Sequence, residues 1–298
     1  MSLGASDRRI QGFLQLYVLI YLTLLNMKTN NIILSSAILA LGGLMISCDN
    51  IDVNDRYIPV EKPNVSKVML IQEFTGNMCT NCPQGANAIH TIQEAFPGQV
   101  IAVGLHPEGG GPNTEPIGDQ DFRCEEAQVM YEYYKPSGFP CAVFNGTTKS
   151  TRFALWYSQV YDIFEEMNKL GEEAKMTISA STSYDASTRD LTVNYEIVPR
   201  VDSDTPMSVM VWIMENDILG YQLDNGTLLD NYIHNHVLRA SMNGGWGETL
   251  PQLVNGDPIT GTASMKLDSK WVAENCQVIV YVFQTDSKYV EQATLADV

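Results

Sequence analysis

The sequence predicts two folded domains, an α/β domain followed by an all-β domain, because the pattern of apolar residues changes along the chain. Residues 67–105 read as a buried strand, a helix and a second buried strand, which is the order of a parallel crossover unit. From about residue 174 the chain becomes a succession of short alternating strands separated by turn residues. We therefore expect an α/β domain over residues 67–172 and a β-domain over residues 173–298.

The segment before the first domain has the features of an export signal. Residues 27–48 contain one lysine, a short apolar stretch and then Cys48. The apolar stretch is too short and too interrupted by glycine for a membrane span. Its last residues, MISC, resemble the lipobox of bacterial lipoproteins, where a signal peptidase cuts before the cysteine and lipid is attached to it. We therefore interpret residues 1–47 as a signal region and Cys48 as the lipidated first residue of the mature protein.

Residues 1–26 add a second apolar stretch upstream of a segment that is already a complete signal. We therefore take Met27 as the true start. The alternative is a helical membrane hairpin over residues 10–47. Residues 48–66 hold few large apolar side chains, and we interpret them as a lipidated tether. On either interpretation the rest of the chain is exported.

The composition disfavours one class of partner. The chain has 18 basic and 35 acidic residues and a net charge of −17. Removal of the signal region would make the charge more negative, because that region contains more basic than acidic residues. Such a surface repels phosphate backbones and anionic lipid headgroups. We therefore expect no nucleic-acid partner.

The segment CTNCP, residues 79–83, is the most informative motif in the chain. It follows an apolar strand over residues 67–74 and precedes a helix, so Cys79 is expected at the N-terminal end of that helix. There the helix dipole and the unpaired amides stabilise a thiolate, which is the nucleophile of disulfide exchange. We predict that Cys79 attacks a disulfide and that Cys82 resolves the mixed disulfide.

Two further features resemble the thioredoxin family. In GFPCAVFNG, residues 138–146, Pro140 matches the cis-proline that packs against the active-site disulfide, and Phe139 matches the residue whose backbone pairs with bound substrate. Glu73, within the first strand, matches the buried carboxylate that handles the proton of the resolving cysteine. A carboxylate in an apolar strand is costly unless it has such a role or a partner. The resemblance implies a thioredoxin-like fold for residues 67–172.

The chain also departs from the thioredoxin pattern. Met78 replaces the tryptophan that usually precedes the first cysteine, and Thr80 and Asn81 stand where reducing members have Gly and Pro. Since this dipeptide tunes the redox potential, the direction of electron flow stays open. Residues 106–122 form an insertion that we expect near the site. The insertion lacks the lysine and the serine or threonine of a phosphate-binding loop.

Two other interpretations of the CTNCP pair were weighed against exchange chemistry. A zinc site would need a second ligand pair, and the available candidates lack the usual companion spacing: Cys124 with Cys141, and His234 with His236. We therefore expect no metal. A purely structural disulfide is the stronger alternative, because exported proteins readily oxidise such pairs.

Three more cysteines follow the motif, Cys124, Cys141 and Cys276. Because three is an odd number, at least one of them is a free thiol or pairs with another molecule. Cys141 directly follows Pro140, which places it near the site. The favoured role for Cys141 is nevertheless that of a small buried residue and not of a redox partner.

Residues 173–298 contain several alternating strand patterns with turn residues between them, which favours an antiparallel sandwich of immunoglobulin-like type. No catalytic constellation is apparent in this segment. In YIHNHVLR, residues 232–239, His234 and His236 fall on one face of a predicted strand. The two histidines could bind a metal, but no third ligand is identifiable, and packing or hydrogen bonding is the favoured role.

The chain as a whole resembles the "outer membrane protein twenty-eight" family of lipoproteins from Gram-negative anaerobes. The resemblance rests on the lipobox and on the segments EFTGNMCTNCPQG, GFPCAVFNG and YIHNHVLR. It implies an outer-membrane lipoprotein, periplasmic or surface-facing, with a thioredoxin-like domain followed by a β-domain.

From these features we expect a membrane-tethered thiol:disulfide oxidoreductase or isomerase. Its partners would be exported thiol or disulfide proteins or a redox partner, and its lipid anchor would hold it at the outer membrane. The redox group would be the Cys79–Cys82 disulfide alone, without a cofactor. The alternative is a non-enzymatic surface binding or adhesion protein in which this pair is structural. The acidity of Cys79 distinguishes the two, because a structural disulfide needs no acidic thiol.

Overall fold

The computed structural model describes residues 65–147, 151–152 and 166–298. The chain divides into two compact units, Met1–Lys62 and Pro63–Val298, and all described residues belong to the second. The predicted signal region, the lipidation site Cys48 and nearly all of the predicted tether lie outside the described residues. No helix in the described part of the chain is long and apolar enough to cross a membrane.

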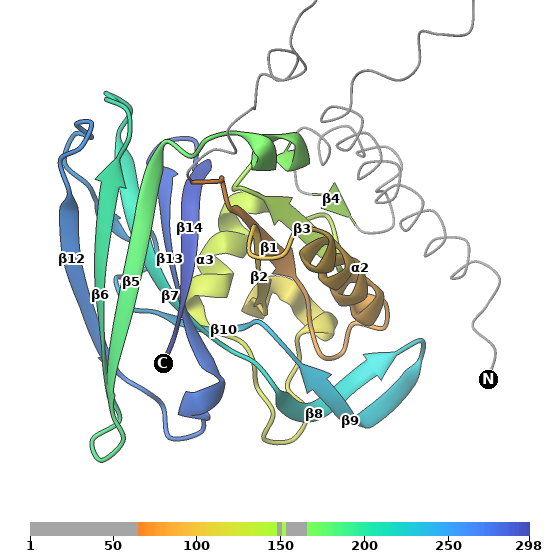
Figure 1. Ribbon diagram of the computed structural model, residues 1–298. Coiled ribbons are helices and arrows are strands. Elements are labelled where there is room, and N and C mark those ends of the chain that lie inside the picture. Colours follow the sequence, from red (N-terminus) through yellow and green to blue (C-terminus); the bar gives the residue numbers. More distant parts are fainter. Residues whose placement is uncertain (1–64, 148–150, 153–165) are drawn as a thin grey trace, which may run out of the picture. The chain divides into compact units, whose positions relative to one another are not determined.

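The first part of the unit contains the strand, helix and strand expected from the sequence (Figure 1). β1 (Met69–Phe74) pairs in parallel with β2 (Val100–Leu105), and α2 (Cys82–Ala95) connects them. β3 (Cys141–Phe144) pairs with the other edge of β1 in the antiparallel direction, and β4 (Thr151–Arg152) follows β3. Both parallel strands are buried along their whole length, which explains their nearly continuous apolar sequence.

Two helical segments lie between β2 and β3, a 3₁₀ helix (Glu108–Asn113) and α3 (Glu125–Tyr134). α3 covers the face of β1 that carries Phe74, whose ring meets the rings of two tyrosines of α3 edge to face. α2 covers the opposite face, which carries Glu73. Successive side chains of a strand point to opposite faces, so these neighbouring residues meet different helices.

The second part of the unit contains a three-stranded sheet formed by β5 (Met176–Asp185), β6 (Asp190–Pro199) and β12 (Ile259–Lys266). This sheet packs against β7 (Met207–Glu215) and β13 (Cys276–Gln284) through an apolar core of aliphatic side chains from both layers. The β-rich segment is thus built from two packed sheets. An immunoglobulin-like classification of this segment stays a proposal.

β7 is buried at every position because both of its faces are covered. Val209, Val211 and Ile213 enter the core shared with the three-stranded sheet. Met210 and Trp212 alternate with them and enter a second core on the other face. This second core also contains side chains of β1, β2 and α3.

A single nine-stranded sheet runs through the unit in the order β14-β13-β7-β10-β2-β1-β3-β4, with β11 (Glu248–Thr249) paired to β7. β10 (Val237–Ser241) lies antiparallel to β7 and parallel to β2, and β14 (Val290–Asp297) forms the far edge. The two predicted domains therefore share one sheet and one apolar core. Their predicted boundary at residue 172 lies within this shared unit.

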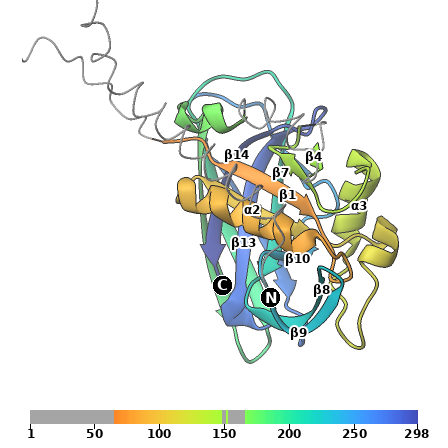
Figure 2. The same ribbon diagram turned by 90° about the vertical axis from the view of Figure 1, so that its right-hand side faces the viewer.

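A separate two-stranded hairpin lies immediately before β10 in the chain. Its strands are β8 (Ile218–Asp224) and β9 (Thr227–His234), which pair only with each other among the described strands. Figures 1 and 2 both show the hairpin beyond the end of the large sheet, next to the start of α2. The hairpin belongs to the β-rich segment, yet it lies beside the CTNCP motif.

Candidate functional site

Cys79 and Cys82 form a disulfide in the turn between β1 and α2. Their Cα atoms are 5.4 Å apart. The Cys79 amide donates to the Gly76 carbonyl over 3.1 Å, and the Cys82 amide donates to the Cys79 carbonyl over 3.2 Å. Cys82 is the first residue of α2, so Cys79 lies in the turn that leads into the helix and not in the helix itself.

Both cysteines are buried, each with 2 % of its surface exposed. A disulfide in contact with solvent could be attacked directly by a thiolate, but this one is enclosed by neighbouring segments. The identity of those segments decides how the disulfide could be reached.

Glu73 is buried on β1, 8 % exposed, and its Oε1 atom has no hydrogen-bond partner. Burial raises the pKa of its carboxyl group to about 8, because an ionised carboxylate is poorly solvated there. A Cβ atom added to Gly85 of α2 would lie 2.7 Å from this oxygen. The carboxyl group therefore lies directly under the first turns of α2, whose first residue is Cys82.

The Phe139–Pro140 peptide bond is cis, and Pro140 is buried. A Cβ atom at Gly85 would lie 2.9 Å from the Cβ atom of Pro140, so this proline meets the same helical turns as Glu73. The structure thus brings Glu73 and Pro140 together against the first turns of α2. Phe139 is half-buried, and its ring lies beside that of Tyr131 on α3.

The β8–β9 hairpin covers the CTNCP turn. The side-chain amide of Gln222 donates to the Gly76 carbonyl over 3.3 Å and to the Cys79 carbonyl over 3.1 Å. The backbone amide of Leu223 donates to the Asn77 carbonyl, and that of Asn225 donates to the Thr80 carbonyl. These bonds hold the tip of the hairpin against the backbone that precedes and follows Cys79 in the chain.

The hairpin is the main feature of the site that the sequence interpretation missed. A signal for it was present, because Asp224, Asn225 and Gly226 form the kind of turn that joins two paired strands. Asn225 and Gly226 both have positive φ, at 47° and 81°, as that turn requires. No local pattern indicates where such a hairpin docks, since its partners lie more than a hundred residues earlier in the chain.

The insertion at residues 106–122 lies beside the site, as expected. The Met78 amide donates to the Asn113 carbonyl over 2.9 Å. Further along the insertion, the Gln120 side chain accepts a hydrogen bond from the Tyr221 amide and donates one to the Tyr221 carbonyl, over 2.6 and 2.8 Å. The insertion therefore contacts the CTNCP turn, and its Gln120 side chain pairs with the backbone of β8 at Tyr221.

The two predicted histidines do not lie on one strand face, and that prediction is wrong. His234 is the last residue of β9, whereas His236 lies between β9 and β10 with a positive φ of 59°. The left-handed residue breaks the strand that the sequence suggested. His234 Nε2 lies 3.0 Å from the Tyr221 carbonyl oxygen, which makes it part of the hairpin's own packing.

The rings of His106 and His234 both meet the Phe122 ring edge to face, with centroid distances of 5.3 and 4.7 Å. Burial lowers the pKa of His106 to about 3 and that of His234 to about 4, so both are neutral at physiological pH. Within the described residues no group of three or more histidine, cysteine and acidic side chains could hold a metal ion. The favoured packing role of His234 agrees with this environment.

The remaining cysteines, Cys124, Cys141 and Cys276, are not part of the Cys79–Cys82 disulfide. Burial raises the pKa of Cys124 and of Cys276 to about 12, which suppresses their thiolates. The thiol of Cys276 donates to the Val272 carbonyl. Cys141 is buried opposite Phe74 in the pairing of β3 with β1, in agreement with the favoured role of a small core residue.

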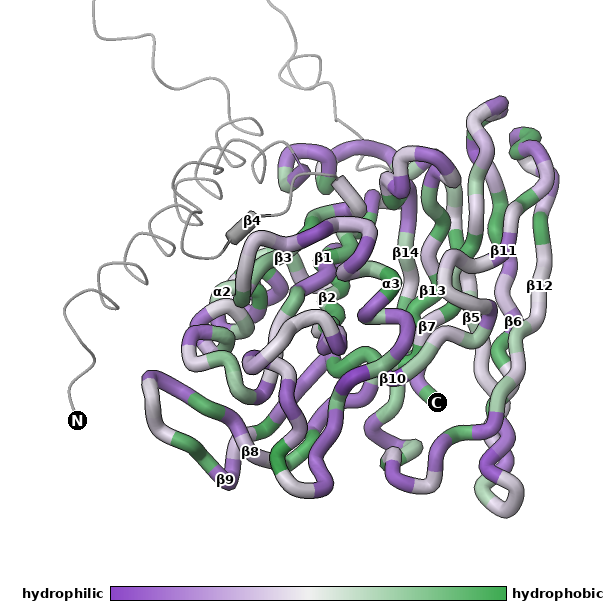
Figure 3. The backbone as a smooth tube through the Cα atoms, turned by 180° about the vertical axis from the view of Figure 1, so that it is seen from behind, coloured by the Kyte–Doolittle hydropathy of each residue, from purple (hydrophilic) through white to green (hydrophobic). Residues whose placement is uncertain are grey.

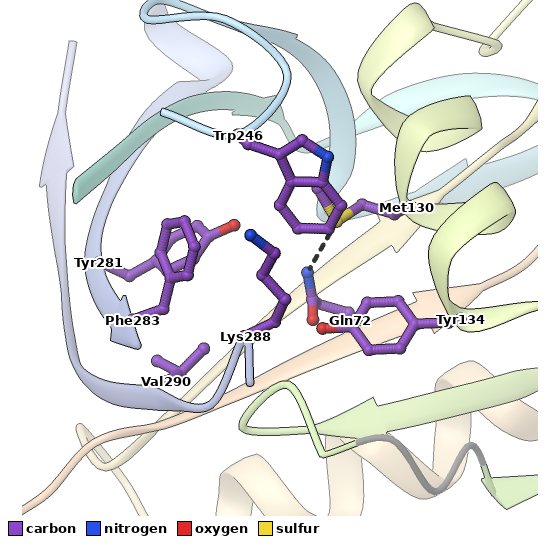
Figure 4. A pocket seen from close by; sticks show the side chains of 8 residues that line it. All are labelled: Gln72, Met130, Tyr134, Trp246, Tyr281, Phe283, Lys288 and Val290. Atoms are coloured by element: carbon purple, nitrogen blue, oxygen red, sulfur yellow. Dashed lines mark hydrogen bonds between the residues drawn. The ribbon is translucent and has the colours of Figure 1, made fainter. Parts of the chain in front are cut away.

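A small, partly open pocket with a volume of about 10 Å³ lies on the α3 side of the sheet (Figure 4). The Lys288 side chain covers the Trp246 ring that lines this pocket, with its ammonium group 4.3 Å from the ring centre. The Gln72 amide donates to the Met130 sulfur, and Gln72 Oε1 has no partner. Ligand pockets usually exceed about 300 Å³, so we assign no ligand to this cavity.

The raised pKa of Glu73 predicts a dependence of stability on pH. Below about pH 4.5 the carboxyl group is protonated in the folded and the unfolded states alike. Between pH 4.5 and 8 the unfolded state loses this proton and the folded state keeps it, so stability falls as pH rises. A pKa shift of one unit corresponds to about 1.4 kcal/mol, so the raised pKa of Glu73 changes the free energy of unfolding by several kcal/mol across this pH range.

We expect the Glu73→Gln variant to lose this component, because the amide does not ionise. Urea unfolding of the oxidised protein at pH 5 and pH 8.5 measures it: the midpoint should fall less in the variant than in the original protein. Glu196→Gln, on an exposed position of β6, is the matched control. An equal fall in all three proteins would contradict the burial of the Glu73 carboxyl group.

Several solved structures are similar to this chain. HBP35 of Porphyromonas gingivalis is 15% identical with a TM-score of 0.62, over 80% of this chain and 77% of that chain, which shows a shared fold. A protein of Agrobacterium tumefaciens is 15% identical with a TM-score of 0.47, over 77% of this chain and 94% of that chain. A domain of the outer membrane lipoprotein Omp28 from Porphyromonas gingivalis is 23% identical with a TM-score of 0.29, over 42% of this chain and 88% of that domain.

No curated protein matches the sequence significantly. The family model described as outer membrane protein Omp28 matches residues 127–298, which is more than half of the chain. The matched residues include the hairpin and begin after the CTNCP motif. The chain therefore belongs to the outer membrane protein Omp28 family, as its resemblance predicted, and its location is the outer membrane.

Proposed function

We propose that this lipoprotein exchanges disulfides with exported proteins at the Cys79–Cys82 pair, within a thioredoxin-like part of the chain. The observation that carries the proposal is the grouping of three features at the start of α2. These are a disulfide in the turn before the helix, the buried Pro140 against the first turns of the helix, and the buried Glu73 carboxyl group, whose pKa is raised to about 8. A disulfide that served stability alone would have no use for an unpaired buried carboxyl group beside it.

The reaction proceeds in two steps from the oxidised pair. A thiolate of the client protein attacks the Cys79 sulfur, the Cys79–Cys82 bond breaks, and Cys82 leaves as a thiolate. A second client thiolate then attacks the mixed disulfide and releases Cys79, so the client becomes a disulfide and the pair becomes a dithiol. Two electrons pass from the client to the protein, and the reverse sequence reduces a client disulfide.

Glu73 would manage the proton of Cys82. Its carboxyl group is neutral below pH 8, so it can donate a proton to the departing Cys82 thiolate. In the reverse direction its carboxylate accepts the proton when Cys82 attacks the mixed disulfide. Phe139 and Pro140 would bind the client backbone beside Cys79, once the neighbouring insertion leaves room for it.

Access to the disulfide requires a movement of the hairpin tip. Gln222 and the backbone amides of Leu223 and Asn225 hold the tip against the CTNCP turn. A typical hydrogen bond contributes only about 0.5–1.5 kcal/mol net, because water replaces the lost partner. Transient release of the tip is therefore compatible with a stable fold, and it would expose Cys79 to a client thiol.

The alternative function is surface binding without catalysis, in which the disulfide only stabilises the turn. The near-complete burial of both cysteines favours this alternative. The acidity of the Cys79 thiol separates the two functions. A catalytic pair holds Cys79 largely as a thiolate at neutral pH, whereas a structural pair has no need of one.

We expect Cys79 of the reduced, detergent-solubilised lipoprotein to react with iodoacetamide at a pH well below the ordinary thiol pKa of about 8.5. The measurement follows alkylation of the peptide that contains Cys79 by mass spectrometry, as a function of pH. Cys79→Ser is the control for the assignment of the reactive thiol. Alkylation that follows an ordinary thiol titration would support the structural alternative.

We also expect Gln222→Ala to expose the disulfide more often, because it removes the side chain that bonds to both carbonyls of the turn. Reduction by dithiothreitol should become about tenfold faster, which corresponds to about 1.4 kcal/mol. The matched control is Gln252→Ala, because Gln252 is exposed and its side-chain amide donates to Asp204, away from the hairpin. Equal rates in all three proteins would show that the hairpin is no barrier.

A further inference from the structure

The outer face of the β8–β9 hairpin is unusually apolar for an exposed strand pair. Among the described residues nine large apolar side chains are exposed, and four of them lie on this hairpin: Leu219, Tyr221, Leu228 and Ile233. Leu219 and Ile233 are directly opposite each other in the strand register and are 65% and 46% exposed. Figure 3 shows the hydrophobic segments alternating with hydrophilic ones along both strands. We call these four residues the hairpin patch.

The two edges of the hairpin differ. The backbone of β8 at Tyr221 is already paired with the side chain of Gln120. β9 has no strand partner other than β8 in the part of the chain that the structure describes. Most of β9 is exposed, and Figures 1 and 2 show it on the outer side of the hairpin. An exposed strand edge of this kind can pair with an extended polypeptide.

The charge of the hairpin favours a polypeptide over a membrane surface. Its residues include Asp224 and Asp230 and no lysine or arginine. Together with the net charge of −17, these aspartates disfavour anionic lipid headgroups. They are compatible with an apolar segment that also carries basic residues.

The inner side of the same hairpin is bonded to the turn that carries Cys79. A chain that pairs with β9 would therefore be held on the hairpin that covers Cys79, and its cysteine would reach the disulfide when the hairpin tip moves away. We propose that β9 and the hairpin patch form the docking surface for an extended apolar, basic segment of an unfolded exported protein whose cysteine exchanges with Cys79. This inference rests on the proposed exchange function for its chemistry, whereas the docking itself can be tested without it.

The docking test uses a synthetic peptide of valine, leucine and lysine residues in which serine replaces the cysteine. Its binding to the detergent-solubilised lipoprotein is followed by fluorescence anisotropy. We expect the Leu219→Ser/Ile233→Ser variant to bind about tenfold or more weakly, since two apolar side chains leave the contact. The matched control is Val201→Ser/Val254→Ser, which removes two apolar side chains outside the hairpin that are 45% and 44% exposed.

Two further peptides test the mode of binding. A peptide with N-methylated alternate amides should lose affinity if it pairs with the β9 edge, because it cannot complete the ladder of hydrogen bonds. A peptide in which serine replaces the apolar residues should also bind weakly. Equal binding of the apolar and serine peptides, or unchanged binding by Leu219→Ser/Ile233→Ser, would overturn the docking surface. Dimerisation that is abolished by the same variant would also overturn it, by showing that a second copy covers the patch.

The exchange test uses the cysteine-containing peptide and glutathione as alternative thiols for the oxidised protein. With the peptide, we expect Leu219→Ser/Ile233→Ser to react more slowly than the original protein, by the same factor as its loss of affinity for the peptide. With glutathione, we expect the variant and the original protein to react at the same rate. If neither the peptide nor glutathione reacts with the oxidised original protein, the proposed function is contradicted. The result of the docking test would still stand in that case. Equal peptide rates in the variant and the original protein would contradict docking as the route to exchange.

Discussion

The pairing of β10 with β2 is the interaction on which the arrangement of the site depends. Val237 lies opposite Gly104, and the Gly104 amide donates to the His236 carbonyl over 2.7 Å. A Cβ atom at Gly104 would lie 3.3 Å from the Thr75 side chain, so a glycine eases the packing of β2 against the residue that follows β1. Because β9 ends at His234, just before β10 begins, this pairing holds the hairpin beside the disulfide.

The same arrangement both protects the disulfide and supplies a means of controlling it. The hairpin tip encloses the CTNCP turn through a few hydrogen bonds, each of modest net strength. Below the tip, burial keeps the Glu73 carboxyl group protonated up to about pH 8. A cover held by a few hydrogen bonds and a nearby protonated carboxyl group are features that a reactive pair would need, and they come from segments that lie far apart in the sequence.

Local features of the site could be predicted from the sequence, and its long-range contacts could not. The apolar run around Glu73 and the spacing of Cys79 and Cys82 predicted the strand, the turn and the helix. Pro140 was placed by a motif. By contrast, YIHNHVLR read as one strand, because nothing in its pattern shows that His236 adopts a left-handed conformation and separates two strands. The docking of Gln222 on the turn depends on the sheet junction, which no local pattern encodes.

The reduction potential of the Cys79–Cys82 pair tests the central claim most directly. The detergent-solubilised lipoprotein would be equilibrated with buffers of reduced and oxidised glutathione, and the fraction of disulfide would be measured by alkylation and mass spectrometry. The account predicts a potential within the range of exchange proteins, from about −270 to −120 mV. A potential below about −300 mV, typical of structural disulfides, would contradict it.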